Sequence, residues 1–80
     1  MKIHNFDGKT NLVGTNIRKF RISRHLSQEE LATKMQLENV EITQKIISRV
    51  ENHQRIVTDY ELFHFAKVLD VDIYELLEIN

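Results

Sequence analysis

The chain has 80 residues, neither cysteine nor proline, and a formal net charge of −1 at neutral pH. This length allows one domain with a modest core, and the missing cysteines exclude disulfides and thiolate metal sites. No apolar run approaches the roughly 20 residues of a membrane span, and the N-terminus lacks the apolar core of a secretory signal, so we expect a cytoplasmic protein.

Residues 1–13 show no clear hydrophobic period and are rich in turn formers, which predicts an N-terminal arm or loop. The remainder, 14–80, is expected to form the folded domain. Its first helix would start near Thr15 or Asn16, because either side chain can cap a helix N-terminus. The apolar side of this helix would consist of Ile17, Phe20 and Ile22.

A second helix is expected at about 28–35. Ser27 and Glu30 form a capping box, in which the serine accepts from the backbone of Glu30 and the glutamate side chain reaches back. Apolar residues with helical spacing follow, namely Leu31, Ala32 and Met35. A polar connection over 36–42 then leads to the next element.

The third helix is predicted over 44–51, directly after Thr43, which is a good N-cap residue. Ile46, Ile47 and Val50 form one apolar face of this helix. The remaining faces are polar and carry Gln44, Lys45, Ser48 and Arg49. A helix patterned in this way buries one side and presents the other to solvent.

Two further capping boxes predict two more helices. Thr58 and Glu61 introduce a helix at about 59–69, whose apolar positions are Leu62, Phe65, Ala66 and Leu69. Asp72 and Glu75 introduce a short last helix that contains Ile73, Leu76 and Leu77. No strand pattern competes with these assignments. We therefore predict an all-α fold of five short helices around one compact core.

The charges are separated along the chain. Up to Arg55 there are ten Lys and Arg against six Asp and Glu, whereas beyond it Lys67 stands against six acidic residues. Segregation of this kind gives one part of a molecule a positive potential whatever the total charge. The near-neutral net charge therefore does not exclude nucleic acid as a partner.

The helices and their motifs resemble the phage repressor/Cro family, also called the Xre family, over about residues 14–77. The resemblance rests on five pieces in the family's order: IRxxR at 17–21, LSQEELA at 26–32, ISRVEN at 47–52, LDV at 69–71 and ELL at 75–77. It implies a compact five-helix, repressor-like helix-turn-helix domain over 14–80. It also implies a sequence-specific transcriptional regulator, more usually a repressor, that binds double-stranded DNA.

In this family the helix that starts here after Thr43 enters the major groove, where base edges carry a readable code. The resemblance places base-reading side chains at Gln44, Lys45 and Arg49. Glutamine suits a bidentate contact with adenine, and lysine or arginine suits guanine. Without the resemblance, a solvated helix face would be the simpler interpretation of these three residues.

Phosphate contacts are expected around this reading face, because they position a protein on DNA without reading its sequence. Gln28 stands at a helix N-terminus, where the dipole favours an anion. The full set of expected phosphate-binding residues is Gln28, Thr43, Ser48, Asn52, Arg55 and Arg18, with Arg24 as a long-range contributor. The resemblance further implies a structural salt bridge between Arg21 and Glu51.

The sequence departs from the family in two places. The connection between the second and third helices is about five residues longer than usual, with the extra residues near Glu38–Ile42. His53 stands where the family usually has glycine after Glu-Asn. We expect Asn52 to adopt the left-handed conformation that ends the third helix, since asparagine does so more cheaply than histidine.

The residues support neither catalysis nor metal binding. The four histidines have no cysteine partners and no i, i+4 spacing, and no phosphate loop or nucleophile–base arrangement is present. We therefore expect no enzyme activity and no cofactor. A homodimer on a two-part operator is the leading hypothesis, because one such chain covers few base pairs. The alternative is a protein-interaction module or antitoxin whose acidic C-terminal half binds a protein partner.

Overall fold

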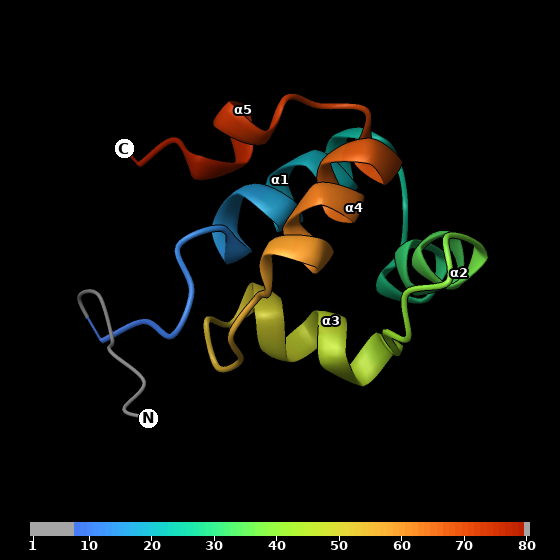
Figure 1. Ribbon diagram of the computed structural model, residues 1–80, viewed down its shortest axis with the longest axis horizontal. Coiled ribbons are helices and arrows are strands. Elements are labelled where there is room, and N and C mark those ends of the chain that lie inside the picture. The colour runs from blue at the N-terminus through green and yellow to red at the C-terminus, as the bar shows by residue number, and fades with distance from the viewer. Residues whose placement is uncertain (1–7, 80) are drawn as a thin grey trace.

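The computed structural model describes residues 8–79 and confirms the predicted all-α fold (Figure 1). Within this range it contains five helices and no strand: α1 Gly14–Ser23, α2 Gln28–Leu37, α3 Gln44–Glu51, α4 Asp59–Leu69 and α5 Ile73–Leu77. Residues 1–7, which belong to the expected N-terminal arm, and Asn80 lie outside the described residues.

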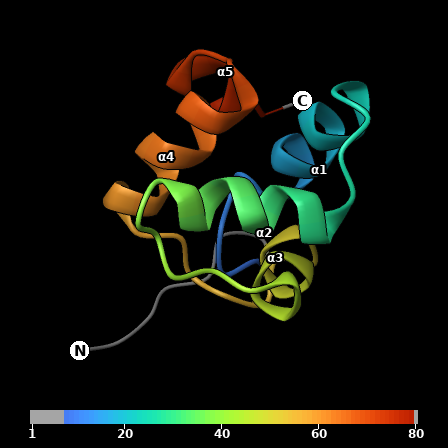
Figure 2. The same cartoon turned by 90° about the vertical axis from the view of Figure 1, so that its right-hand side faces the viewer.

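The helices pack so that α3 lies along one edge of the molecule. Helix α1 contacts α3, α4 and α5, while α2 contacts α3 and α4. Figure 1 shows α3 below α1 and α4, with α5 at the opposite end of the molecule. Figure 2 shows α2 running across α3, which is the arrangement of a helix-turn-helix pair. One long side of α3 is therefore left open to solvent.

One apolar core joins all five helices. Its fully buried side chains are Ile17, Leu31, Met35, Ile42, Ile47, Val50, Phe65, Leu69 and Leu76. Burial of apolar surface on this scale is the main stabilising contribution in a domain of this size. None of the helices within residues 8–79 is long and apolar enough to cross a membrane.

Local capping signals set most helix boundaries. The capping boxes predicted at the starts of α2, α4 and α5 are all present. Helix α2 runs to Leu37, two residues beyond the predicted end. It stops there because Asn39 adopts a left-handed φ of 61° and the next amide, that of Val40, donates back to the carbonyl of Met35 at 3.0 Å.

The predicted start of α1 at Thr15 or Asn16 is wrong. The helix begins at Gly14, and Val13 in the N-cap position provides no side-chain cap. Instead, Asn11 Oδ1 accepts from the Gly14 amide at 2.8 Å, three residues on. Thr15 and Asn16 use their side chains for contacts with other parts of the fold.

One other expectation, for the apolar side of α1, is also corrected. Ile22 is 47% exposed and does not belong to the apolar face. Arg24 donates to the carbonyl of Leu69 at 2.9 Å and to that of Asp70 at 3.0 Å. These carbonyls end α4, so the guanidinium satisfies acceptors that a helix C-terminus leaves open.

The long connection between α2 and α3 is fixed at several points. Val40 and Ile42 are buried in the core, and Gln36 Nε2 donates to the Ile42 carbonyl at 2.8 Å. Glu38 forms an ion pair with Lys67 of α4. The hydrogen bond from Lys67 lowers the pKa of the Glu38 carboxyl, while burial acts in the opposite direction. The extra residues therefore form an ordered turn that is tied to α4.

The expectation that Asn52 ends α3 in a left-handed conformation is wrong. Asn52 has φ −91°, and the following residue, His53, has φ 60°. The ring of His53 forms hydrogen bonds with Asn11 and Thr15, and a glycine at this position could not form them. These contacts offset the steric cost of a left-handed histidine.

Candidate nucleic-acid interface

Helix α3 forms because its N-cap residue and the spacing of its apolar residues both favour a helix in this segment. Thr43 is extended, with φ −99° and ψ 167°, and its hydroxyl accepts from the amide of Ile46 at 3.3 Å. Ile47, Val50 and Glu51 face the interior. The helix is therefore held along one side and exposed along the other.

The exposed side of α3 carries the three residues predicted to read bases. Gln44, Lys45 and Arg49 are all exposed. Gln44 and Lys45 lie in the first turn, and Arg49 lies one turn beyond Lys45, where i and i+4 side chains share a face. Arg49 Nη2 lies 3.4 Å from the carbonyl of Gln54, which leaves most of its guanidinium donors available.

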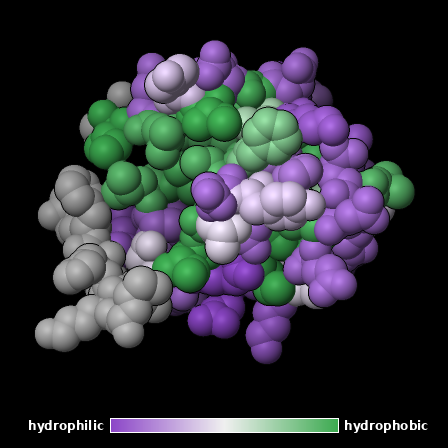
Figure 3. Space-filling view, in the orientation of Figure 1, coloured by the Kyte–Doolittle hydropathy of each residue, from purple (hydrophilic) through white to green (hydrophobic). Residues whose placement is uncertain are grey.

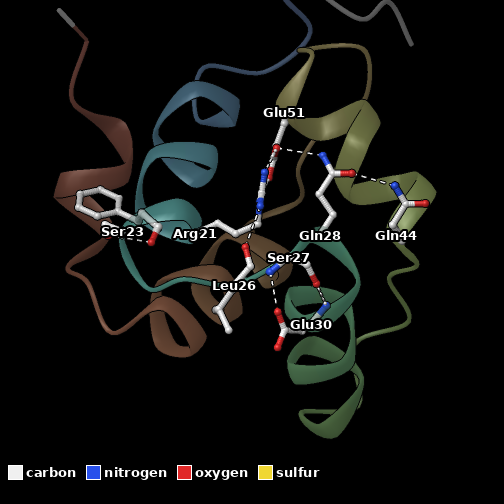
Figure 4. Close-up of polar contacts among 9 residues, drawn as sticks. Arg21, Ser23, Leu26, Ser27, Gln28, Glu30, Gln44 and Glu51 are labelled. Carbon is white, nitrogen blue, oxygen red and sulfur yellow. Dashed lines mark hydrogen bonds and ion pairs between the residues drawn. The ribbon is translucent and has the colours of Figure 1, made fainter.

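A hydrogen bond joins the first residues of α2 and α3. Gln44 Nε2 donates to Gln28 Oε1 at 2.8 Å, and Gln28 Nε2 donates to Glu51 Oε1 at 3.1 Å. Figure 4 shows the resulting line of contacts from Glu51 through Gln28 to Gln44. The sequence predicts Gln28 as a phosphate ligand. In the fold its side chain holds the amide of Gln44 in one orientation.

Glu51 forms a bidentate ion pair with Arg21 of α1. Arg21 Nε lies 2.7 Å from Glu51 Oε2, and Arg21 Nη2 lies 3.0 Å from Oε1. The two side chains are only 11% and 2% exposed, and Arg21 Nη1 also donates to the carbonyl of Leu26 at 2.8 Å. The pair therefore joins α1, the end of α3 and the residue just before the α2 cap (Figure 4).

The other expected phosphate ligands occupy different environments. Thr43 already accepts a hydrogen bond as the α3 cap, although its exposed hydroxyl still has a proton to donate. Ser48 is half-buried on α3, and Asn52 is exposed at its end. Arg18 is exposed on α1, outside the helix pair. Thr43, Ser48 and Asn52 thus lie along α3, whereas Arg18 lies apart from them.

Arg55 is already engaged by a carboxylate. Its Nη1 and Nη2 atoms lie 2.9 and 3.1 Å from the two carboxylate oxygens of Glu61. Burial raises the pKa of Glu61, but hydrogen bonds from Arg55 and Thr58 outweigh it, so the pKa lies below its ordinary value. A phosphate would have to share this arginine with Glu61, or displace Glu61 from it.

Sequence reasoning did not identify the N-terminal residues that contact α3. Asn11 Nδ2 donates to the carbonyl of Val50 at 3.0 Å, in the last turn of that helix. One local signal could have found part of this arrangement. The side chain of Asn11 accepts from the amide three residues later, that of Gly14, and this is the usual spacing between a capping side chain and the amide it binds.

No group of three or more His, Cys, Asp or Glu side chains within residues 8–79 is arranged to hold a metal ion. The exposed face of α3 offers hydrogen bonding from Gln44 and positive charge from Lys45 and Arg49. Exposed amides and cations on an open helix are the groups that recognise base edges and phosphates.

Comparisons with known proteins agree with this geometry. A family model described as helix-turn-helix matches residues 17–76, a range that includes α2, α3 and α4 completely. The chain is similar to the crystal structure of the restriction-modification controller protein C.AhdI from Aeromonas hydrophila. The two are 31% identical, with a TM-score of 0.70, and the match covers 81% of this chain and 90% of that one. No curated protein matches the sequence significantly.

Proposed function

The chain belongs to the helix-turn-helix family of the phage repressor/Cro (Xre) type, whose members are DNA-binding transcriptional regulators, and from that premise we propose how it reads DNA. Helix α3 enters the major groove, and Gln44, Lys45 and Arg49 contact base edges. Occupation of a two-part operator would block a promoter, so we propose repression. The family favours this function over a protein-interaction module.

The observation that carries the proposal is the hydrogen bond from Gln44 to Gln28. An amide nitrogen has two protons, so Gln44 keeps one donor and its carbonyl oxygen for a base. This is the pair of groups that adenine N7 and N6 require. Because Gln28 fixes the amide before DNA arrives, less side-chain freedom is lost on binding.

Gln28 can serve the DNA backbone at the same time. One of its amide protons is donated to Glu51, and the second remains available to a phosphate oxygen. The N-terminus of α2 adds the positive end of a helix dipole. Ser48 and Asn52 offer further donors along α3, and the exposed Arg18 adds positive charge.

We expect a random pool of duplexes to yield one enriched symmetric site. Gln44→Ala and Arg49→Ala should each weaken binding to that site by roughly 1–2 kcal/mol and relax the preference at one base position. Affinity of the parent should fall steeply with salt, because phosphate contacts release counterions. Anisotropy titration from low to high salt measures both effects.

Gln54→Ala is the matched control for Gln44→Ala, since Gln54 is exposed and lies beyond the reading helix. Arg18→Ala should lower affinity for all sequences alike and reduce the salt slope. If Gln44→Ala and Arg49→Ala bound the selected site as tightly as the parent, α3 would not be the helix that reads bases.

We also propose that two copies of the chain bind the operator together. Exposed apolar side chains gather near α5, where Tyr74 is 80% and Ile79 is 62% exposed. A shallow groove that includes Leu77 of α5 is also lined by Leu12, Ile56, Val57 and Leu62. Figure 3 shows apolar side chains clustering over α5 on this face, and an apolar patch of this kind is typical of an interaction site.

Tyr74→Glu should convert the dimer to a monomer and weaken operator binding about tenfold, since the second half-site contact is no longer linked to the first. The substitution lies on an exposed side chain and should leave the fold intact. Leu37→Glu is the control, because Leu37 is 76% exposed on α2, away from α5. Sedimentation at micromolar concentration measures the mass, and a monomeric parent would contradict the proposal.

A further inference from the structure

The residues that precede α1 are bound to the C-terminal end of α3. We call residues 8–13 the N-terminal strap. Asn11 Nδ2 donates to the carbonyls of Val50 at 3.0 Å and Arg55 at 2.8 Å, while its Oδ1 accepts from Gly14. Asn11 itself is only 8% exposed. One buried amide thus connects the strap, the last turn of α3, the loop that follows it and the start of α1.

His53 also holds this strap. Its Nδ1 lies 3.0 Å from the carbonyl oxygen of Asn11, and its Nε2 lies 2.8 Å from Thr15 Oγ1. A carbonyl can only accept, so Nδ1 carries the proton and donates it, and in the neutral ring Nε2 accepts from the threonine hydroxyl. The backbone adds a further contact, because the amide of Thr10 donates to the His53 carbonyl at 3.1 Å.

The backbone conformation of His53 is unfavourable for a histidine, so its side-chain contacts are needed to explain why a histidine stands there. A left-handed φ of 60° is costly for histidine and costs glycine nothing in steric terms. His25 has nearly the same conformation, with φ 58°, but is exposed, and its ring forms no hydrogen bond with residues 8–79. Within residues 8–79 two histidines are therefore left-handed, of which one is bonded to the strap and the other is not.

We propose that His53 is a positioning residue for the DNA-reading helix. Its ring fixes the strap against the end of α3, and the fixed strap sets the angle at which α3 enters the groove. This inference rests on the proposed function, since it assigns a role in the reading of DNA to residues that do not read bases themselves.

The geometry of a short helix explains why its C-terminal end matters. The N-terminal end of α3 is held by the contact between Gln44 and Gln28, and the other end by Glu51 and the strap. Eight residues form a helix about 12 Å long, so a displacement of about 1 Å at one end tilts it by about 5°. Arg49, near the strap end, would move relative to the base edge that it contacts.

The test compares His53→Gly with His25→Gly in the full chain. Both substitutions relieve a left-handed side chain, so neither should lower the urea midpoint substantially, and His25→Gly should raise it. In His53→Gly we expect the amides of Thr10 and Gly14 to exchange with solvent at least ~10-fold faster, because the strap opens more often. Their acceptors, the carbonyl of His53 and the side chain of Asn11, are still present in this variant.

DNA binding supplies the second measurement. His53→Gly should bind the duplex selected by the parent about 3- to 10-fold more weakly, the range expected for one or two neutral hydrogen bonds, while affinity for random duplex stays unchanged. His25→Gly should match the parent in amide exchange and in both affinities. Thr15→Ala, which removes only the partner of Nε2, should show a smaller effect in the same direction.

Unchanged exchange at Thr10 and Gly14 in His53→Gly would overturn the inference, because the ring would not then hold the strap. Faster exchange with unchanged operator affinity would also overturn it, since the strap would not position α3. If the parent itself selected no duplex, the proposed function would fail, and with it the role in DNA reading. The exchange data would still decide whether His53 holds the strap.

Discussion

Replacement of Arg21 by methionine is expected to destabilise the protein by about 3–5 kcal/mol, because it leaves a buried carboxylate without its counter-ion. Glu51 is 2% exposed, and Arg21 supplies two of the three donors that reach it. Glu51 also stands at the C-terminal end of α3, where the helix dipole disfavours negative charge. The loss is a large fraction of the stability of a domain this small, and urea unfolding followed by circular dichroism measures it.

Arg18→Met is the control, since Arg18 is exposed on the same helix and its loss should change stability by no more than about 0.5 kcal/mol. The double variant Arg21→Met/Glu51→Leu should recover most of the stability, because no unpaired charge remains in the interior. A cost below about 1 kcal/mol for Arg21→Met would show that the pair behaves as a surface salt bridge.

The same double variant should separate stability from DNA reading. With leucine at position 51, Gln28 loses the acceptor that holds its amide, and Gln44 is then positioned only by a side chain that can itself rotate. Operator affinity should therefore stay below that of the parent although the fold is restored. In that case the ion pair is needed to orient the groups that read DNA, more than to stabilise the domain.

Helix boundaries could be predicted wherever the capping group is next to the helix in sequence. Helices α3 and α4 begin at the predicted residues because Thr43 and Thr58 cap their own first turns, and both also end where predicted. The predicted start of α1 is wrong because the side chain that bonds its first amide belongs to Asn11, which lies two residues before the N-cap position at Val13. Thr15 and Asn16 are equally good capping residues by type, and only the tertiary fold shows that their side chains are used elsewhere.

The contacts of the candidate site also differ in whether local sequence patterns could predict them. The shared exposed face of Gln44, Lys45 and Arg49 follows from the helical period alone, so the sequence could predict it. The bond between Gln28 and Gln44 depends on how two helices cross, which no local pattern specifies. From the sequence, Arg55 is expected to be a free cation, but in the fold it forms an ion pair with Glu61, six residues later.

His53 shows why a local rule can fail. Judged by backbone cost alone, Asn52 is the better residue for a left-handed helix end. The rule considers only the residue itself, whereas both ring nitrogens of His53 have partners more than 35 positions away in the chain. Contacts with the N-terminal strap thus decide a backbone conformation at the end of α3.

The close approach of α1 to α3 leads to the last prediction, which concerns Gly14. A Cβ atom at this position would lie 2.2 Å from the carbonyl oxygen of Val50 and 3.0 Å from Asn11 Oδ1. The first of these atoms belongs to the backbone of α3 and already accepts a hydrogen bond from Asn11, so it cannot move aside without breaking that bond. Gly14 is therefore needed for space, although it lies in a helix and does not have a left-handed φ.

Gly14→Ala should destabilise the protein by about 2–3 kcal/mol, even though alanine within a helix is usually favoured over glycine by about 0.5–1 kcal/mol. The collision forces α1 away from the end of α3, so the amide of Thr10 in the strap should also exchange faster. Gly8 is the contrasting control: it has a φ of 74° but nothing within 4 Å of an added Cβ, so Gly8→Ala should cost only the strain of a left-handed alanine, about 1–2 kcal/mol. Urea unfolding measures the change in stability. Increased stability in Gly14→Ala would mean that α1 can shift on α3 without a loss of stability. The strap and the reading helix would then not be packed as tightly as this contact requires.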